Sequence, residues 1–222
     1  DISRVVITFN IPEELKIKKN IYPFEIIIIV NKAIKGFGSN HNQAFKECNS
    51  KYFCVLNPDI RFNENPFKIL IKGLNLNDRN VLIAPQVLNL DGKIEDSLRH
   101  FPTPWSLILR ILKITSNTYT RNKNTNIIYP DWIAGMFLLF KSEYFHETKG
   151  FDDKYFLYFE DVDLCLRVWK NKKILLVDSS VNIIHDARRY SRKKLSYLLM
   201  HLKSAFRFFI LFLLRFPKKE VN

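Results

Sequence analysis

The feature that most constrains the fold of this chain is the alternation of short apolar runs with helical stretches. Runs such as 5–9, 25–30 and 52–56 are short and apolar, which is typical of buried strands. Strands that alternate with helices predict a layered α/β sheet. We expect strands at 5–9, 25–30, 52–56, 81–84, 133–140 and 173–177, and helices at 12–19, 40–49, 64–73, 104–113, 142–147, 160–170 and 191–214.

A cluster of acids lies at the start of the helix predicted at 160–170. Glu160, Asp161 and Asp163 fall within four residues and are flanked by aromatic and apolar side chains. Clustered carboxylates beside apolar surface repel and desolvate one another, which raises the pKa of at least one of them. Such a carboxylate can take a proton near neutral pH. Acids also complement the dipole of a helix N-terminus, and the two interpretations are compatible.

Two further polar positions follow apolar runs. Asp59 ends the turn Asn57-Pro58-Asp59 after the run 52–56. Ligands of open α/β sheets bind at the carboxyl ends of strands, so Asp59 is a candidate ligand for a metal or a phosphate, although Asn-Pro-Asp is also an ordinary turn signal. His185 follows the apolar pair 183–184. A lone histidine there is usually structural, but beside Asp59 and the acids it is a candidate metal ligand.

A glycine-rich loop precedes the helix predicted at 40–49. Gly36 and Gly38 stand in it, and Asn42 follows within the helix. Such a loop lets backbone N–H groups approach a phosphate or a sugar. It is not the glycine fingerprint of dinucleotide-binding folds, and alone it is a weak signal.

Together these motifs resemble glycosyltransferase family 2, in particular its rhamnosyltransferase-like branch, which builds bacterial surface polysaccharides. The matching segments occur in the order expected for the family, and the likeness covers roughly residues 36–207. They are the glycine-rich segment 36–42, Leu-Asn-Pro-Asp at 56–59, Trp-x-x-Gly at 132–135, the long acidic motif at 150–167, and Ile184-His185.

The resemblance implies a GT-A (Rossmann-like) fold, with a mixed, mainly parallel sheet flanked by helices, a nucleoside-diphosphate sugar donor and inversion at the anomeric carbon. It also implies a divalent cation, Mg²⁺ or Mn²⁺. Asp59 matches the last residue of the family's Asp-x-Asp motif, whose first acid is replaced by Asn57, so His185 is expected to share the metal. The implied roles are catalytic base for Asp161, support of the base for Glu160 and Asp163, and contact with sugar and acceptor for Trp132 and Gly135.

The first forty residues depart from the family pattern. Thr8 and Asn10 stand at the nucleotide-facing end of the first strand. The second strand is followed by Asn31, where the family usually has an acid, and the glycine-rich loop comes almost at once. Either a strand–helix unit is missing or two are merged. Further along, Arg99 resembles a family arginine that would offset charge on the leaving diphosphate, although a solvated arginine before a helix fits equally.

The charge of +13 requires an anionic partner, and nucleic acid, anionic lipid and phosphorylated substrates are the candidates. Basic residues cluster at 188–194, and an apolar segment rich in Leu and Phe follows at 195–216. Its uninterrupted apolar run, 208–214, is too short to span a bilayer, and Lys203 and Arg207 break the longer segment, which favours an amphipathic interfacial helix. A helix packed on the core fits equally. We therefore expect a domain at 1–190 and a membrane-associating helix at 191–222.

These observations predict an inverting, metal-dependent glycosyltransferase. Its best candidate reaction moves L-rhamnose from dTDP-rhamnose onto a lipid-linked saccharide. Three cysteines without metal-ligand spacing suggest reduced thiols, so we expect a cytoplasmic protein, peripheral at the inner face of the plasma membrane. One alternative is a degenerate, non-catalytic transferase that acts as a membrane scaffold. Another is a basic nucleic-acid-binding domain, but acids would repel a phosphate backbone, so we expect no nucleic-acid partner.

Overall fold

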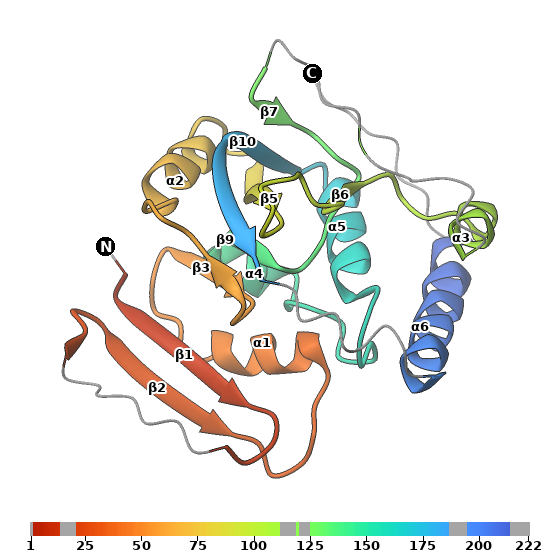
Figure 1. Ribbon diagram of the computed structural model, residues 1–222, viewed down its shortest axis with the longest axis horizontal. Helices are drawn as coiled ribbons and strands as arrows, with labels where there is room; N and C mark the ends of the chain where they lie inside the picture. Colours follow the sequence, from red (N-terminus) through yellow and green to blue (C-terminus); the bar gives the residue numbers. More distant parts are fainter. Residues whose placement is uncertain (1, 14–20, 112–118, 120–124, 187–194, 214–222) are drawn as a thin grey trace.

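A six-stranded mixed sheet forms the centre of the molecule (Figure 1). The structure, a computed structural model, describes residues 2–13, 21–111, 119, 125–186 and 195–213. The strands follow the order β3-β9-β5-β10-β4, and β7 pairs with β10 beside this path. Their bounds are β3 (Tyr52–Leu56), β4 (Ile60–Arg61), β5 (Asn80–Leu88), β7 (Ile127–Ile128), β9 (Phe137–Lys141) and β10 (Ile174–His185).

The long strands of this sheet mostly share one direction. β5 and β10 pair in parallel, while β9 lies antiparallel between β3 and β5, so β3, β5 and β10 run the same way. The short strand β4 returns antiparallel along the end of β10. The expected mixed α/β sheet, mainly of parallel strands and flanked by helices, is confirmed.

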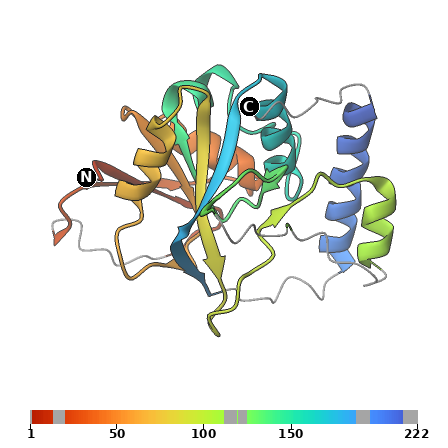
Figure 2. The ribbon, with the colours of Figure 1, turned by 90° about the horizontal axis from the view of Figure 1, so that it is seen from above.

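Helices cover the sheet because its strands are apolar on both faces. α2 (Phe67–Asn75) and α5 (Glu160–Lys170) lie on opposite sides of the sheet (Figure 2). The core between them consists of buried apolar side chains. Fully buried residues come from both helices and from the strands, among them Leu70, Leu74, Leu82, Leu138, Leu164 and Leu175. α4 (Ser142–Glu147) follows β9 directly and adds Tyr144 and Phe145 to the core.

The N-terminal strands form a sheet of their own. β1 (Arg4–Phe9) and β2 (Glu25–Val30) pair in parallel, and the structure gives them no ladder with the central sheet. Only residues 31–36 separate β2 from α1 (Phe37–Phe45), so no strand–helix unit lies between them. The helix expected at 12–19 falls mostly outside the described residues, and Pro12 and Glu13 are not helical.

Several expected elements change their bounds, and two of the changes affect the site. The strand expected at 133–140 is divided into β8 (Trp132–Ile133) and β9 by a turn that contains Gly135. The strand expected at 173–177 continues to His185, since β10 passes an irregularity after Asp178 and resumes pairing with β5. β8 also pairs with β6 (Leu98–Arg99) in a small separate sheet.

Two helices stand beside each other at the edge of the molecule. α3 (Pro104–Ile111) and α6 (Leu195–Leu213) lie outside the central sheet in both views (Figures 1 and 2). None of the helices within the described ranges is both long and apolar enough to cross a membrane. The basic cluster 188–194 lies outside the described residues.

Candidate active site

The acid cluster forms the first turn of α5, at the edge of the sheet. Glu160, Asp161 and Asp163 all lie in that turn, as both interpretations of the cluster require. The helix follows two residues with positive φ, Tyr158 at 68° and Phe159 at 67°. Such left-handed backbone is uncommon for bulky aromatic residues and persists where the surroundings hold it.

Asp161 is held by backbone donors. Its Oδ2 accepts the N–H of Gly135 at 3.0 Å, and its Oδ1 accepts the N–H of Val162 at 2.8 Å. Desolvation raises the pKa of Asp161, while the two amides and the charge of Arg99 oppose the rise. The residue as a whole is half-buried. A carboxylate whose pKa lies above its ordinary value is suited to accept a proton.

Glu160 differs from its neighbour in environment. Its residue is only 5% exposed, and its Oε2 has no hydrogen-bond partner among the described residues. Burial, and then the adjacent Asp161 charge, raise the pKa of Glu160 to about 8. The two adjacent carboxyls differ in their hydrogen bonds, since Asp161 accepts two backbone N–H groups while Oε2 of Glu160 accepts none among the described residues.

Asp163 supports the loop that leads into α5. Its Oδ2 lies 2.9 Å from Nε of Arg167, one helical turn on. The same guanidinium donates to the carbonyl oxygens of Thr148 and Gly150, each at 2.8 Å. Arg167 therefore fastens α5 to the segment before it, and Asp163 orients Arg167.

A second polar group lies where β4 meets the end of β10. Register places His185 opposite Ile60, next to Asp59. Nε2 of His185 lies 3.4 Å from Oδ2 of Asp59, and Nδ1 lies 2.8 Å from Oε2 of Glu95. A carboxylate behind a histidine fixes its tautomer and raises the basicity of the other nitrogen.

This group fits a divalent cation. The second oxygen of Asp59, Oδ1, is buried without a partner among the described residues, while Nε2 of His185 lies near the first oxygen, Oδ2. The described part of the chain holds no cluster of three such ligands. A site with few protein ligands suits a cation that also binds substrate phosphates.

Arg99 and Trp132 face each other across the small β6–β8 sheet. The guanidinium carbon of Arg99 lies 5.1 Å from the centroid of the Trp132 ring, and its Nη2 pairs with Asp96 at 2.7 Å. Trp132 is buried, and its Nε1 donates to the carbonyl of His100 at 3.0 Å. Trp132 thus supports Arg99, whose charge acts on Asp161.

Asparagines join the ends of β1 and β2 to α1. Nδ2 of Asn31 lies 3.0 Å from Oδ1 of Asn10 and 2.7 Å from Oδ1 of Asn40. Oδ1 of Asn31 is buried and has no partner in the described structure. Thr8 lies in β1 two residues before Asn10, opposite Ile29. An amide oxygen left open at strand ends can accept a hydrogen bond from a ligand.

The glycine-rich loop packs against the segment that leads into α5. A Cβ on Gly36 would lie 2.5 Å from the carbonyl oxygen of Phe156, and one on Gly38 would lie 2.6 Å from Cβ of Phe151. Asn42 binds the backbone N–H and carbonyl of Phe151 at 2.9 and 2.8 Å. These contacts supply packing reasons for all three residues, beside the donor-binding role that the sequence predicts.

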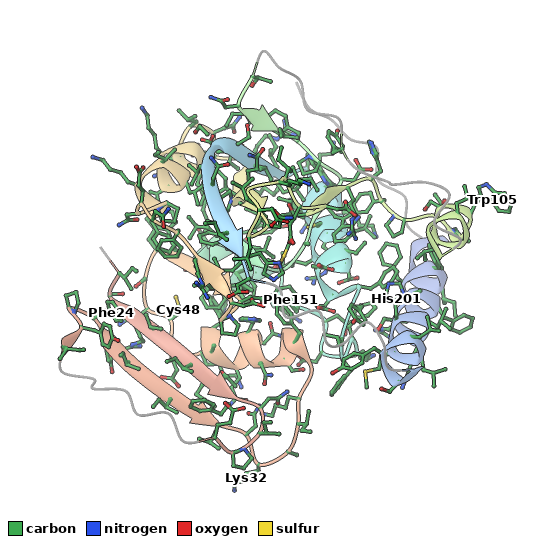
Figure 3. All side chains as sticks on the ribbon, in the orientation of Figure 1. Phe24, Lys32, Cys48, Trp105, Phe151 and His201 are labelled. Carbon is green, nitrogen blue, oxygen red and sulfur yellow. The ribbon has the colours of Figure 1, made fainter. Side chains whose placement is uncertain are left out.

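The start of α1, the first turn of α5 and the turn at 57–59 all contact the turn between β8 and β9. A Cβ on Gly135 would lie 3.2 Å from the ring of Phe37 in α1 and 3.7 Å from Cβ of Asp161. The N–H of Asn57 donates to the carbonyl of Met136 at 3.0 Å, which ties the Asp59 turn to the same place. Phe151 lies near α1 and α5, close to this junction (Figure 3).

Sequence reasoning missed three contacts. Glu95 gave no motif, and its contact with His185 joins residues 90 positions apart. Asn40 stood in the glycine-rich segment but was not singled out. α6 also holds the positive-φ pair, since Phe159 packs against His201 and Phe208 at centroid distances of 5.3 and 5.4 Å. His201 lies on the side of α6 that faces the domain (Figure 3).

Solved structures support the fold. The chain aligns with GalNAc-T7 bound to UDP, GalNAc and Mn²⁺, with a TM-score of 0.65, 14% identity and coverage of 92% of this chain and 41% of the other. It also aligns with the mannosyltransferase PcManGT from Pyrobaculum calidifontis, bound to GDP-Man and Mn²⁺ (TM-score 0.53, 13% identity, 88% and 48% coverage). These likenesses establish the GT-A fold.

Sequence relatives supply the family. Rhamnosyltransferase WbbL of Escherichia coli K12 is 30% identical over 190 residues, which are 81% of this chain and 72% of the relative. The N-acetylglucosaminyl-diphospho-decaprenol L-rhamnosyltransferase of Mycobacterium tuberculosis is 27% identical over 191 residues, 81% of this chain and 61% of the relative. The family description "Glycosyl transferase family 2" matches residues 10–146, more than half of the chain. The chain therefore belongs to glycosyl transferase family 2 and is a rhamnosyltransferase-like glycosyltransferase.

Proposed function

We propose that this glycosyltransferase moves a sugar from a nucleoside diphosphate to a hydroxyl group of a lipid-linked saccharide, with inversion at the anomeric carbon. The observation that carries the proposal is the setting of Asp161. Its carboxylate accepts the N–H groups of Gly135 and Val162, desolvation raises its pKa, and the buried carboxyl of Glu160 stands next to it. This is the environment that a general base requires.

In this mechanism Asp161 accepts the proton of the acceptor hydroxyl as its oxygen attacks the anomeric carbon. The bond to the diphosphate breaks on the opposite face, so a single displacement inverts the configuration. Glu160 and Asp163 hold Asp161 and its loop in place, and Gly135 faces the sugar and acceptor. Arg99, supported by Trp132, offsets the charge that develops on the leaving group.

The divalent cation is proposed to bind Asp59 and His185. When bound there, it supplies Lewis-acid stabilisation of the departing nucleoside diphosphate. Asn57 lacks the charge of an acid, so an imidazole carries more of the binding, which favours Mn²⁺ over Mg²⁺. Glu95 orients the imidazole through Nδ1.

The donor is proposed to lie across the carboxyl ends of β1 and β2 and the start of α1. Asn10 and Asn31, with Thr8, then line the nucleotide, and Gly36, Gly38 and Asn42 shape the loop beside it. The best candidate donor is dTDP-rhamnose, because the sequence relatives are rhamnosyltransferases. The name of the mycobacterial relative includes a decaprenol diphosphate, which supports a lipid-linked acceptor. Such an acceptor would require the protein to work at the inner face of the plasma membrane.

Replacing Asp161 by Asn tests the proposal, since it removes the proton acceptor and preserves shape. We expect transfer to fall by at least ~10²–10⁴-fold while donor binding is retained. Transfer from dTDP-rhamnose is followed by chromatography, and NMR of the wild-type product reads its anomeric configuration. The matched control is Asp78→Asn, which changes an exposed aspartate outside the acid cluster and the donor loop.

Near-normal turnover by the folded Asp161→Asn protein would refute the role of Asp161, and a retained configuration would refute the single displacement. A wild-type chain that binds the donor tightly but transfers no sugar would instead favour the non-catalytic scaffold. That alternative is specific to this chain, because its first forty residues depart from the family pattern.

A further inference from the structure

α6 is apolar on two opposite faces, which a helix packed on a globular domain is not expected to be. Its inner face, Ser204, Ala205 and Phe208, is buried. Its outer stripe remains exposed and consists of Leu198, Leu199, Leu202, Phe206 and Ile210. Phe206 is 69% exposed. Contiguous exposed apolar surface of this kind marks an interaction site.

The inner face fixes the helix firmly, so the stripe is not exposed through loose packing. Oγ of Ser204 donates to the carbonyl of Leu157 at 2.8 Å. Nη2 of Arg207 pairs with Oδ2 of Asp152 at 2.6 Å. The ring of Phe208 packs against Phe159. The outer stripe is thus a fixed feature of the fold.

A groove runs between this helix and the segment before α5. Its volume is about 650 Å³, within the range of roughly 300–1,000 Å³ found for small-molecule sites. Phe156 forms one wall, and the residues that α6 contributes include Phe206, Ile210, Lys203 and Arg207. Lys154, in the segment before α5, also lines the groove. The groove is therefore mainly apolar and has basic side chains along its rim.

The charges of the groove indicate what it binds. Arg207 pairs with Asp152, whose carboxyl also feels the charge of Lys154. Lys203 forms no salt bridge with a carboxylate in the described part of the chain, so three cations face one carboxylate here. An apolar floor with a net cationic rim complements an amphiphile whose head is anionic. A second copy of the chain fits poorly, because a symmetric contact would bring the same lysines together.

The groove shares its wall with the active site. The carbonyl of Phe156 accepts the N–H of Phe37, the first residue of α1, at 2.9 Å, and four residues later the chain reaches Glu160. A molecule in the groove therefore lies on the segment that leads directly into the acid cluster. A lipid in the groove would therefore be joined through this segment to the helix that carries Asp161.

We propose that this groove binds the hydrocarbon chain of the acceptor lipid, with the adjoining phosphates paired to Lys154 and Lys203. The proposal rests on the proposed function, because it assigns a site to the lipid of that acceptor. The ligand class is a polyprenyl diphosphate, an extended apolar chain with an anionic end.

Binding is measured by calorimetry on the whole chain without donor or metal. The probe is farnesyl diphosphate, and farnesol and inorganic diphosphate represent its tail and head alone. We expect the intact probe to bind more tightly than either part. Ile210→Asp and Lys203→Glu should each weaken its binding by about tenfold or more, since one removes apolar burial and the other reverses a charge.

Matched controls lie on α2. Ile69 is 46% exposed and Ile210 is 48% exposed, both on helices, so Ile69→Asp controls for an acid on an exposed apolar site. Lys68→Glu controls for the change in net charge. Both controls should bind farnesyl diphosphate as the wild type does.

Equal affinities of the α6 variants and the controls would overturn the proposal, as would absence of wild-type binding. Binding to phosphatidylglycerol vesicles without binding to farnesyl diphosphate would assign the stripe to a membrane surface instead. Dimerisation that Ile210→Asp abolishes would assign it to a second copy. The binding assay contains no donor, so it tests the groove independently of sugar transfer. A chain that binds farnesyl diphosphate but transfers no sugar would refute the proposed function, and the lipid-binding role of the groove would be retained.

Discussion

At the scale of single residues, the acid pair makes stability depend on pH. Folding raises the pKa of Glu160 from 4.5 to about 8, chiefly by burial, so the folded state binds this proton more tightly than the unfolded state does. The stabilisation is present below the unfolded pKa and is lost as pH rises through the folded one.

We therefore expect the free energy of unfolding to fall by roughly 1–3 kcal/mol between pH 5 and 8, because each tenfold change in proton affinity is worth about 1.4 kcal/mol. Glu160→Gln should flatten this dependence, and urea denaturation at several pH values measures it. Glu143→Gln, an exposed acid on α4, is the control. An unchanged slope in Glu160→Gln would contradict the assignment.

Glu95 provides a second test at the residue scale. It contacts Nδ1 of His185, while Asp59 lies at Nε2. Partners behind a ligating histidine typically contribute about 10–100-fold to metal affinity. We expect Glu95→Gln to weaken Mn²⁺ binding by that factor in calorimetric titration, and Glu143→Gln to leave it unchanged. If Glu95→Gln bound Mn²⁺ as tightly as the wild type does, Glu95 would have no role in metal binding.

At the scale of elements, α4 ends in a strained residue. Lys149 has φ 58°, its N–H bonds to the carbonyl of His146, and the N–H of Gly150 bonds to that of Phe145. This is the glycine-preferring end of a helix. Lys149→Gly should raise the free energy of unfolding by about 1 kcal/mol. Lys46→Gly, at φ −61° after α1, should lower it. Thermal denaturation compares the two, and equal effects would refute the argument.

The elements also show what the sequence could predict. Glu160, Asp161, Asp59 and His185 were found because local patterns, a helix start and two strand ends, carry their positions. Glu95 was not found, since its contact with His185 arises only when the residues after β5 fold back and Glu95 donates its N–H to Val87. The turn at Gly135 was not predicted either, because the apolar residues on both sides of it form a pattern typical of one continuous strand.

At the scale of the whole molecule, the charge of +13 and the stripe on α6 predict a salt-sensitive attachment to anionic vesicles. Increasing salt should weaken sedimentation with phosphatidylglycerol vesicles but not abolish it, because only the electrostatic part is screened. Leu199→Asp should reduce the vesicle binding that persists at high salt, because it removes apolar contact. Leu76→Asp, at an exposed leucine beside α2, should not. Sedimentation that salt abolishes completely, or that Leu199→Asp leaves unchanged, would exclude the apolar contribution.

The positive-φ pair Tyr158–Phe159 has a consequence for how this chain can be dissected. Each such residue costs on the order of 1–3 kcal/mol, and the rings of α6 are among the contacts that offset this cost. A chain ending at residue 190 would release the backbone ahead of Glu160 and remove the lipid groove in one step. Loss of activity in such a fragment would therefore carry no information about membranes. Single substitutions at Leu198, Leu199 or Leu202 separate attachment from catalysis, because these residues line neither the inner face of the helix nor the groove.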